Sequence, residues 1–155
     1  MTLPVAEVRS LPRHIFRSTE AELYRYPSYV REYRLTKRYI EDVTTCSDSP
    51  GSGSEPVGGG PLRIPDLQKA IEKVQDSRRL RDLEGCIFPI EEAMGLLKET
   101  MPDHWQLVEM KYFRGRSWLE IQATLHLSER RCYDIRREAI EHVAPLLWGA
   151  YGRNT

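Results

Sequence analysis

Four arginines gather in the stretch SERRCYDIRRE (128–138), two on each side of a Cys-Tyr-Asp-Ile centre. The guanidinium group carries a planar fork of N–H donors, which matches the O6 and N7 acceptors of guanine and the oxygens of phosphate. The chemistry that these residues offer is therefore non-covalent recognition of DNA. The alternative is an amphipathic helix whose charged face only meets water.

A helix through this stretch, at about 3.6 residues per turn, divides its side chains between two faces. We expect the inward face to hold Cys132, Ile135, Ala139, Val143 and Leu146. The opposite face suits base edges in the major groove, and its expected base-facing residues are Glu129, Arg130, Tyr133, Asp134 and Arg137. Phosphate contacts fix register without reading sequence, and the residues expected to make them are Arg116, Ser128, Arg131 and Arg136. A carboxylate repels phosphates unless it accepts from cytosine or orients an arginine, so Asp134 favours base reading over unspecific attraction.

A second, shorter helix precedes this one. Ser117 and Glu120 fit the capping box S-x-x-E, in which each side chain satisfies the backbone N–H of the other residue. The helix that they open is WLEIQATL (118–125), after which HLS turns the chain and Ser128 caps the next helix. Gly115 ends the helix upstream, because glycine tolerates a left-handed backbone. This order predicts a helix-turn-helix, with a small helical bundle as the alternative.

The segment 107–147 resembles the C-terminal helix-turn-helix of the RinA and ArpU phage transcriptional regulators, and it is similar to region 4 of bacterial sigma factors. The most specific likeness is the capping serine, the aromatic residue, the basic pair and the final apolar stretch, namely Ser128, Tyr133, Arg136, Arg137, Ala139 and Ile140. The resemblance implies a cytoplasmic activator, encoded by a phage or prophage of Gram-positive bacteria, that drives late genes for packaging and virion assembly. Its partners would be double-stranded DNA and host RNA polymerase.

Two residues depart from the family pattern. Gln122 stands where a small residue, usually alanine, follows the isoleucine of the first helix, although Ala123 lies beside it. His126 stands at the turn position that glycine or asparagine usually fills. Histidine tolerates positive φ better than most residues, so we expect the turn to survive.

The whole chain reads as all-α. Tyr29, Tyr33 and Ile40 recur at helical spacing after Pro27, which we expect in the first turn of a helix. The predicted order is an irregular arm (1–18), an N-terminal helical segment (19–43), a flexible Gly/Ser linker (44–65), a long kinked helical segment (66–101), the helix-turn-helix domain (102–148) and a tail (149–155).

The segment 66–101 carries the apolar rhythm of helices that pack at a shallow angle. Its stripe comprises Leu67, Ile71 and Val74, then Leu80, Leu83, Ile87, Ile90, Met94, Leu97 and Met101. The stripe predicts a core face or a dimer seam. Gly85 and Pro89 interrupt it, which predicts a kink or a short break near 86–89.

The composition of the chain argues against several classes of protein. The 155 residues have a formal net charge of zero, which counts mildly against a DNA binder, although one basic face can steer DNA. Three cysteines without CxxC spacing suggest free thiols in a reducing cytosol. The sequence has neither a run of about 18 apolar residues for a membrane span nor the apolar centre of a signal peptide.

No motif predicts catalysis, a metal or a cofactor. The four histidines lie far apart, and no nucleophile motif occurs. Three functions stay open: a sequence-specific transcription activator, a DNA-packaging component like a small terminase subunit that assembles as a ring, and a protein-interaction module that engages RNA polymerase without touching DNA.

Overall fold

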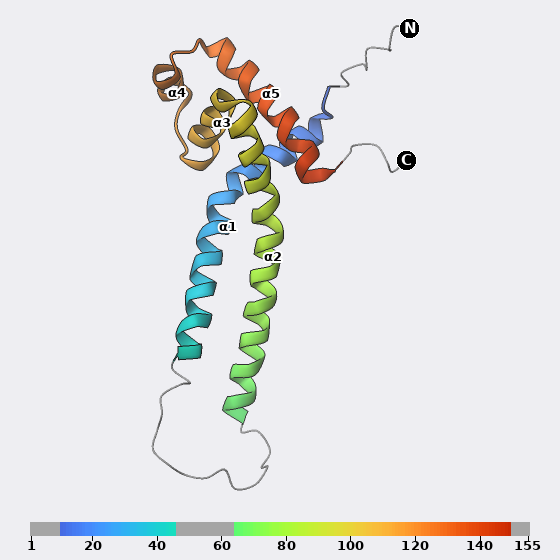
Figure 1. The fold of residues 1–155 in the computed structure, drawn as a ribbon, viewed down its shortest axis with the longest axis vertical. Helices are drawn as coiled ribbons and strands as arrows, with labels where there is room; N and C mark the ends of the chain where they lie inside the picture. Colours follow the sequence, from blue (N-terminus) through green and yellow to red (C-terminus); the bar gives the residue numbers. More distant parts are fainter. Residues whose placement is uncertain (1–9, 46–63, 150–155) are drawn as a thin grey trace, which may run out of the picture. The chain divides into compact units, whose positions relative to one another are not determined.

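The computed structural model describes residues 10–45 and 64–149, and all regular structure in these two ranges is helical. The elements are α1 (Arg13–Thr45), α2 (Ile64–Thr100), α3 (Pro102–Val108), the π-helical stretch η2 (Glu109–Phe113), α4 (Trp118–Leu125) and α5 (Glu129–Trp148) (Figure 1). The all-α prediction is confirmed. No helix in the described ranges is apolar over a long enough stretch to cross a membrane.

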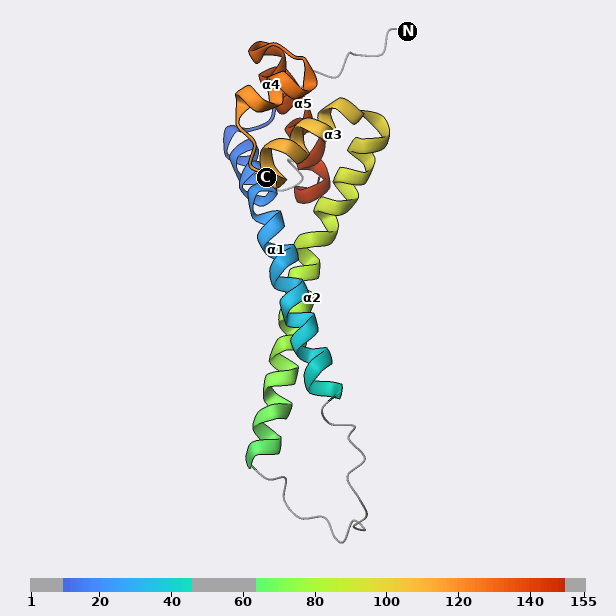
Figure 2. The same cartoon turned by 90° about the vertical axis from the view of Figure 1, so that its left-hand side faces the viewer.

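The chain divides into two compact units, and both long helices take part in each of them. Of the described residues, unit 1 comprises 10–26 and 88–149, and unit 2 comprises 27–45 and 64–87. Unit 1 therefore combines the first turns of α1 and the last turns of α2 with α3, η2, α4 and α5 (Figure 2). The C-terminal helices do not form a compact unit by themselves.

Helix α1 begins at Arg13, so the prediction of an irregular arm is wrong for residues 13–18, and residues 1–9 lie outside the described part. The early start has a packing reason, because Thr19 and Leu23 are fully buried and Phe16 packs against the same core. The Thr19 hydroxyl donates to the Ile15 carbonyl at 2.8 Å, which satisfies this buried polar group.

Pro27 lies inside α1 rather than in its first turn, so that expectation is also wrong. A proline in a helix removes one backbone N–H donor, which usually limits the helix. Here the helix continues to Thr45 and contains the whole predicted segment 19–43.

We predicted a kink or a short break near 86–89. Helix α2 runs without a break through Gly85 and Pro89, so the alternative of a break is wrong. Burial offsets the hydrogen bond that Pro89 cannot make, because Ile87 and Ile90 beside it are 5 % and 1 % exposed. Most of the predicted linker falls on residues 46–63, which lie outside the described part, and its ends at 44–45 and 64–65 are helical. The predicted tail is described only at Gly149.

The core of unit 1 has two clusters of buried side chains. The larger joins α1, α2, α3, η2 and α5, and its members include Leu23, Ile90, Leu97, Val108, Tyr112, Ile140 and Val143. The smaller joins α3, α4 and α5 through Leu107, Ile121, Cys132 and Ile135. Because a fully buried Leu or Ile contributes about 1.5–3 kcal/mol, each cluster can hold its helices in place.

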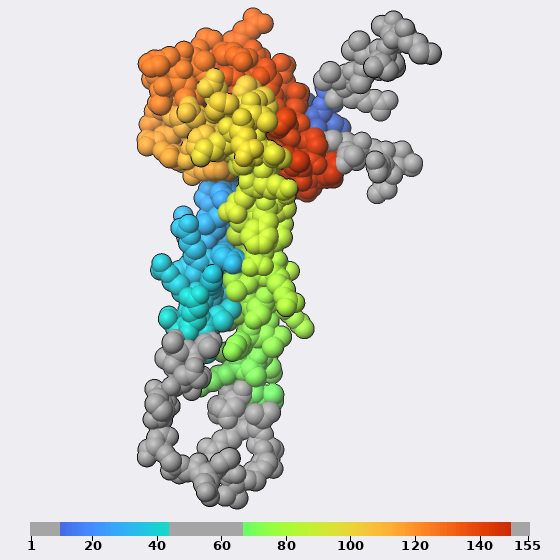
Figure 3. All heavy atoms as spheres, in the orientation of Figure 1, coloured from blue at the N-terminus to red at the C-terminus, as the bar shows by residue number. Residues whose placement is uncertain are grey.

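Unit 2 is a pair of helical stretches from α1 and α2, which touch in the space-filling view (Figure 3). The Tyr33 hydroxyl donates to the Glu84 carboxylate at 3.0 Å, and Arg79 pairs with Glu32. The predicted apolar stripe is buried at Leu83 and Ile87. At Leu67, Ile71 and Val74 it is 49 %, 50 % and 52 % exposed, so this part of α2 has no complete apolar cover within the described chain.

Candidate nucleic-acid interface

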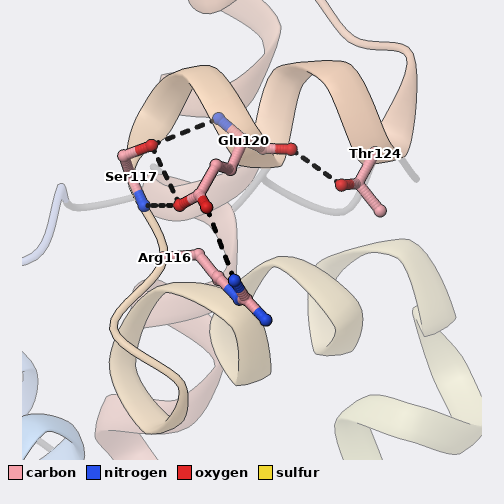
Figure 4. A network of polar contacts seen from close by, with 4 residues as sticks. All are labelled: Arg116, Ser117, Glu120 and Thr124. Atoms are coloured by element: carbon pink, nitrogen blue, oxygen red, sulfur yellow. Dashed lines mark hydrogen bonds and ion pairs between the residues drawn. The ribbon is translucent and has the colours of Figure 1, made fainter.

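Helix α4 begins with the predicted capping box, which is confirmed (Figure 4). The Glu120 backbone N–H donates to Ser117 Oγ at 3.3 Å, and the Ser117 backbone N–H donates to Glu120 Oε2 at 2.8 Å. The hydrogen bond from the Ser117 backbone lowers the pKa of the Glu120 carboxyl, with further lowering from the Ser117 hydroxyl and Arg116. These bonds fix the start of α4 at the residue that the sequence predicted.

Between η2 and this cap the chain makes a tight turn, which two backbone hydrogen bonds hold. The Arg114 N–H donates to the Glu109 carbonyl at 3.0 Å and the Arg116 N–H donates to the Met110 carbonyl at 2.9 Å. Gly115 has φ of 63°, so the predicted left-handed helix end is confirmed.

The turn between α4 and α5 depends on one left-handed residue. His126 has φ of 54° and ψ of 43°, and the Leu127 N–H donates to the Gln122 carbonyl at 3.1 Å. Ser128 then caps α5, because its Oγ accepts from the Arg131 N–H at 3.2 Å. The predicted turn and cap are confirmed, although His126 replaces the usual glycine.

The inner face of α5 packs as the helical wheel predicted, with one exception. Cys132, Ile135, Ala139 and Val143 are buried, and burial raises the pKa of the Cys132 thiol. Leu146 is 42 % exposed, so its inward placement was wrong. Leu147 packs against the core instead, because a step of four residues from Val143 continues the buried stripe.

The outer face of α5 carries all five expected base-facing residues. Glu129, Arg130, Tyr133 and Arg137 are exposed, and Asp134 is half-buried. Asp134 Oδ1 lies 3.7 Å from Arg137 Nη2, so the two side chains form a loose, exposed ion pair. The surface thus offers arginine donors, two carboxylates and one aromatic ring.

Tyr133 is held from the side by α4. Its ring centroid lies 4.9 Å from that of Trp118, and Lys111 Nζ lies 4.7 Å from the Trp118 ring. Aromatic pairs and cation–π contacts of this kind limit side-chain motion. The aromatic position on the outer face is therefore supported by both neighbouring helical elements.

The expected phosphate contacts are distributed around this face, and three of them are exposed. Arg116 lies 3.4 Å from Glu120, and Arg131 lies 3.4 Å from Glu138. Such exposed pairs are weak and exchange readily with other acceptors. The exposed Ser128 lies at the N-terminus of α5.

Arg136, the fourth expected phosphate contact, is partly buried and pairs within the protein. Its Nη2 lies 2.6 Å from Glu20 Oε1, and its Nε donates to the same oxygen at 2.7 Å. The Tyr112 hydroxyl also donates to Glu20 Oε1, at 2.5 Å. Arg136 therefore joins α5 to α1 and η2 inside unit 1.

The directions of the pKa shifts in this network are those expected of a partly buried charge pair. Burial and then the hydrogen bond to Glu20 raise the pKa of the Tyr112 hydroxyl far above its usual range. Burial works to lower the pKa of Arg136, but its hydrogen bonds with Tyr112 and Glu20 raise it overall. The tyrosine therefore stays protonated and the arginine charged. No spacing in the sequence relates Glu20 to Arg136, so pattern reasoning missed this network.

A second link holds α3 against α5. His104 Nε2 lies 2.7 Å from Glu138 Oε2, and His104 is 9 % exposed. The hydrogen bond from His104 is the main cause that lowers the pKa of Glu138. This histidine is therefore part of the packing of α5.

The N-terminal residues also reach the outer face of α5. A hollow of about 420 Å³ lies between them, with Arg13 and Phe16 on one side and Tyr133, Asp134 and Arg137 on the other. The Phe16 ring lies 5.2 Å from the Arg136 guanidinium. Sequence reasoning gave no sign that α1 would border this surface.

The outer face of α5 can bind a partner through arginine donors, carboxylate acceptors and an aromatic ring. Among residues 10–45 and 64–149 no group of three His, Cys, Asp or Glu side chains is arranged to hold a metal ion. Comparison of the chain with models of known protein families gives no match. Comparisons with curated proteins and with solved structures give no match either.

Proposed function

We propose that this chain is a sequence-specific DNA-binding transcription activator that inserts α5 into the major groove. The observation that carries the proposal is the division of α5 between a buried face and an outer face with Arg130 and Arg137 exposed. The short α4, the left-handed turn at His126 and the capped α5 follow the order of a helix-turn-helix. The major groove is about 12 Å wide and admits one such helix.

In this proposal the outer face reads bases. Arg130 and Arg137 donate to guanine O6 and N7, and Asp134 either orients Arg137 or accepts from cytosine N4. Tyr133, supported by Trp118, presents its ring and hydroxyl between them. Arg116, Arg131 and the backbone N–H groups behind Ser128 bind phosphates on either side of the groove.

The biological role that we propose rests on the resemblance of one segment of the sequence to known regulators. The segment 107–147 resembles the C-terminal part of RinA and ArpU regulators and region 4 of sigma factors. On this basis the chain acts in the cytoplasm of a bacterial host, on late genes of a phage or prophage. Host RNA polymerase is then the second partner.

The test is selection of duplexes from a randomised library, followed by sequencing and affinity measurement at near-physiological salt. We expect one enriched motif. Arg130→Ala and Arg137→Ala should each cost about 1–3 kcal/mol on it and relax the preference at one base pair. Leu119→Ala, at an exposed residue of α4, is the matched surface control. If each substitution weakens binding equally on all duplexes, the two arginines contact only phosphates. If the selection enriches no motif, sequence-specific binding is overturned.

A packaging protein of the small-terminase type is the second candidate. The exposed Leu67, Ile71 and Val74 of α2 favour it, because an apolar stripe of this kind suits self-association. Mass measurement in solution separates the two candidates. A large ring would favour packaging, and a monomer or dimer that binds one motif would favour the activator.

A further inference from the structure

The hollow between α1 and α5 brings two segments that are far apart in the sequence to one surface. Arg13, from the first turn of α1, lines it opposite Tyr133, Asp134 and Arg137 of α5. Three of the five expected base-facing residues thus border a segment that belongs to no helix-turn-helix. Whatever binds the outer face of α5 therefore comes close to Arg13.

The hollow is lined by three arginines, Arg13, Arg136 and Arg137, and by two carboxylates, Asp134 and Glu141. Arg136 is compensated by Glu20 at 2.6 Å, and Arg137 has Asp134 at 3.7 Å. Arg13 is exposed and forms no ion pair with any side chain in the described part of the molecule. Its guanidinium is free to bind an anion, and phosphate is the anion that flanks a helix in the major groove.

The position of Arg13 is also fixed by the packing of α1 on α5. The Trp148 Nε1–H donates to Thr19 Oγ1 at 3.0 Å, and Glu20 bonds to Arg136 on the same side. The Phe16 ring contacts the Arg136 guanidinium. Because these contacts order the backbone of the first turns of α1 before any ligand arrives, binding has to order only the side chain of Arg13.

We propose that Arg13 is a phosphate contact of the DNA interface, on the strand that flanks α5 on its α1 side. The inference rests on the proposed function. It extends the interface beyond the helix-turn-helix to the N-terminal turn of α1. In this role Arg13 fixes the register of α5 and reads no base, because a phosphate oxygen is the same at every step.

The experiment measures the affinity of the full chain for its selected duplex and for a scrambled duplex at several salt concentrations. Arg13→Ala should weaken binding about tenfold on both duplexes, and it should lower the slope of log K against log salt by about 1. Arg13→Lys should keep most of the slope, since the charge stays. Arg17→Ala is the matched control, because Arg17 is exposed on the same helix but does not line the hollow.

The outcomes separate this inference from the proposed function. If wild-type protein binds and Arg13→Ala changes neither affinity nor slope, the phosphate contact is overturned while the function stands. If Arg13→Ala binds more tightly, the first turn of α1 obstructs DNA and the inference is overturned. If the wild-type protein binds no duplex, the proposed function is overturned, and the role of Arg13 is overturned with it. The thermal midpoint of Arg13→Ala should match wild type, which shows that loss of binding does not come from unfolding.

Discussion

Glu20 of α1 and Arg136 of α5 form an ion pair with 2.6 Å between Oε1 and Nη2, and their side chains are 15 % and 29 % exposed. The same carboxylate accepts from Tyr112 of η2. A partly buried pair with further hydrogen bonds sets the orientation of the elements that carry it. The helix proposed to read DNA is thereby linked to the N-terminal helix by this ion pair, in addition to the hydrogen bond from Trp148 to Thr19.

Removal of this carboxylate should destabilise unit 1. We expect Glu20→Gln to lower the free energy of unfolding by about 1–3 kcal/mol, because Arg136 keeps its charge without a charged partner. Urea unfolding followed by circular dichroism measures the effect. The double variant Glu20→Leu/Arg136→Met should lose less than the sum of the two single variants, since it leaves no unpaired charge. Additive losses would contradict a direct interaction between the two side chains.

The capping box at α4 should be sensitive to loss of one oxygen. Ser117→Ala removes the acceptor for the Glu120 N–H and should cost about 0.5–2 kcal/mol of unfolding free energy. Ser77→Ala is the matched control, because Ser77 lies within α2 and its hydroxyl bonds only the Lys73 carbonyl. The control should be neutral or slightly stabilising, since alanine has the higher helix propensity. Equal effects of the two substitutions would show that the cap contributes nothing.

The left-handed turn residue gives a third prediction. His126→Val should destabilise the protein by more than about 1 kcal/mol, because a β-branched side chain is poorly tolerated at φ of 54°. His126→Gly relieves the steric strain and should be neutral or stabilising. Thermal unfolding of the two variants checks the order. A valine variant as stable as the glycine variant would mean that the turn adopts another conformation in solution.

The bond between Glu138 and His104 gives a pH dependence. The pKa of Glu138 is lowered in the folded state, first by the hydrogen bond from His104. Its contribution to stability is therefore present above the carboxyl's unfolded pKa and is lost as the pH falls through the lower folded value. Glu138→Gln should flatten this acid limb of stability against pH, measured by urea unfolding between about pH 3 and 7. His104→Asn should remove part of the same loss of stability at acid pH. If Glu138→Gln loses stability at acid pH as the wild type does, Glu138 is not the group responsible.

Tyr133 allows packing and recognition to be separated. Tyr133→Ala loses the ring contact with Trp118 and should cost about 0.5–1.5 kcal/mol of stability. Tyr133→Phe keeps the ring and should leave stability unchanged. If the hydroxyl contacts DNA, Tyr133→Phe should still weaken binding to the selected duplex in a fluorescence anisotropy titration. Equal affinities of wild type and the phenylalanine variant would assign the residue to packing alone.

The sequence alone determined the local structure around the candidate interface. Ser117, Glu120, His126 and Ser128 act within a few residues of themselves, so their types and spacing were enough to predict the caps and the turn. The buried face of α5 also followed from periodicity, except at Leu146, where the stripe shifts by one residue. The alternative of a helix break near Pro89 was wrong, because burial of Ile87 and Ile90 offsets the backbone hydrogen bond that Pro89 cannot make.

Only the tertiary structure decided which arginines stay exposed. Arg131, Arg136 and Arg137 look alike in the sequence, but Arg136 pairs with Glu20 from the other end of the chain. The same packing brings Arg13 to the edge of the hollow beside α5. Contacts between residues so far apart depend on how whole helices pack around a shared core, and no local pattern of residue types encodes that arrangement.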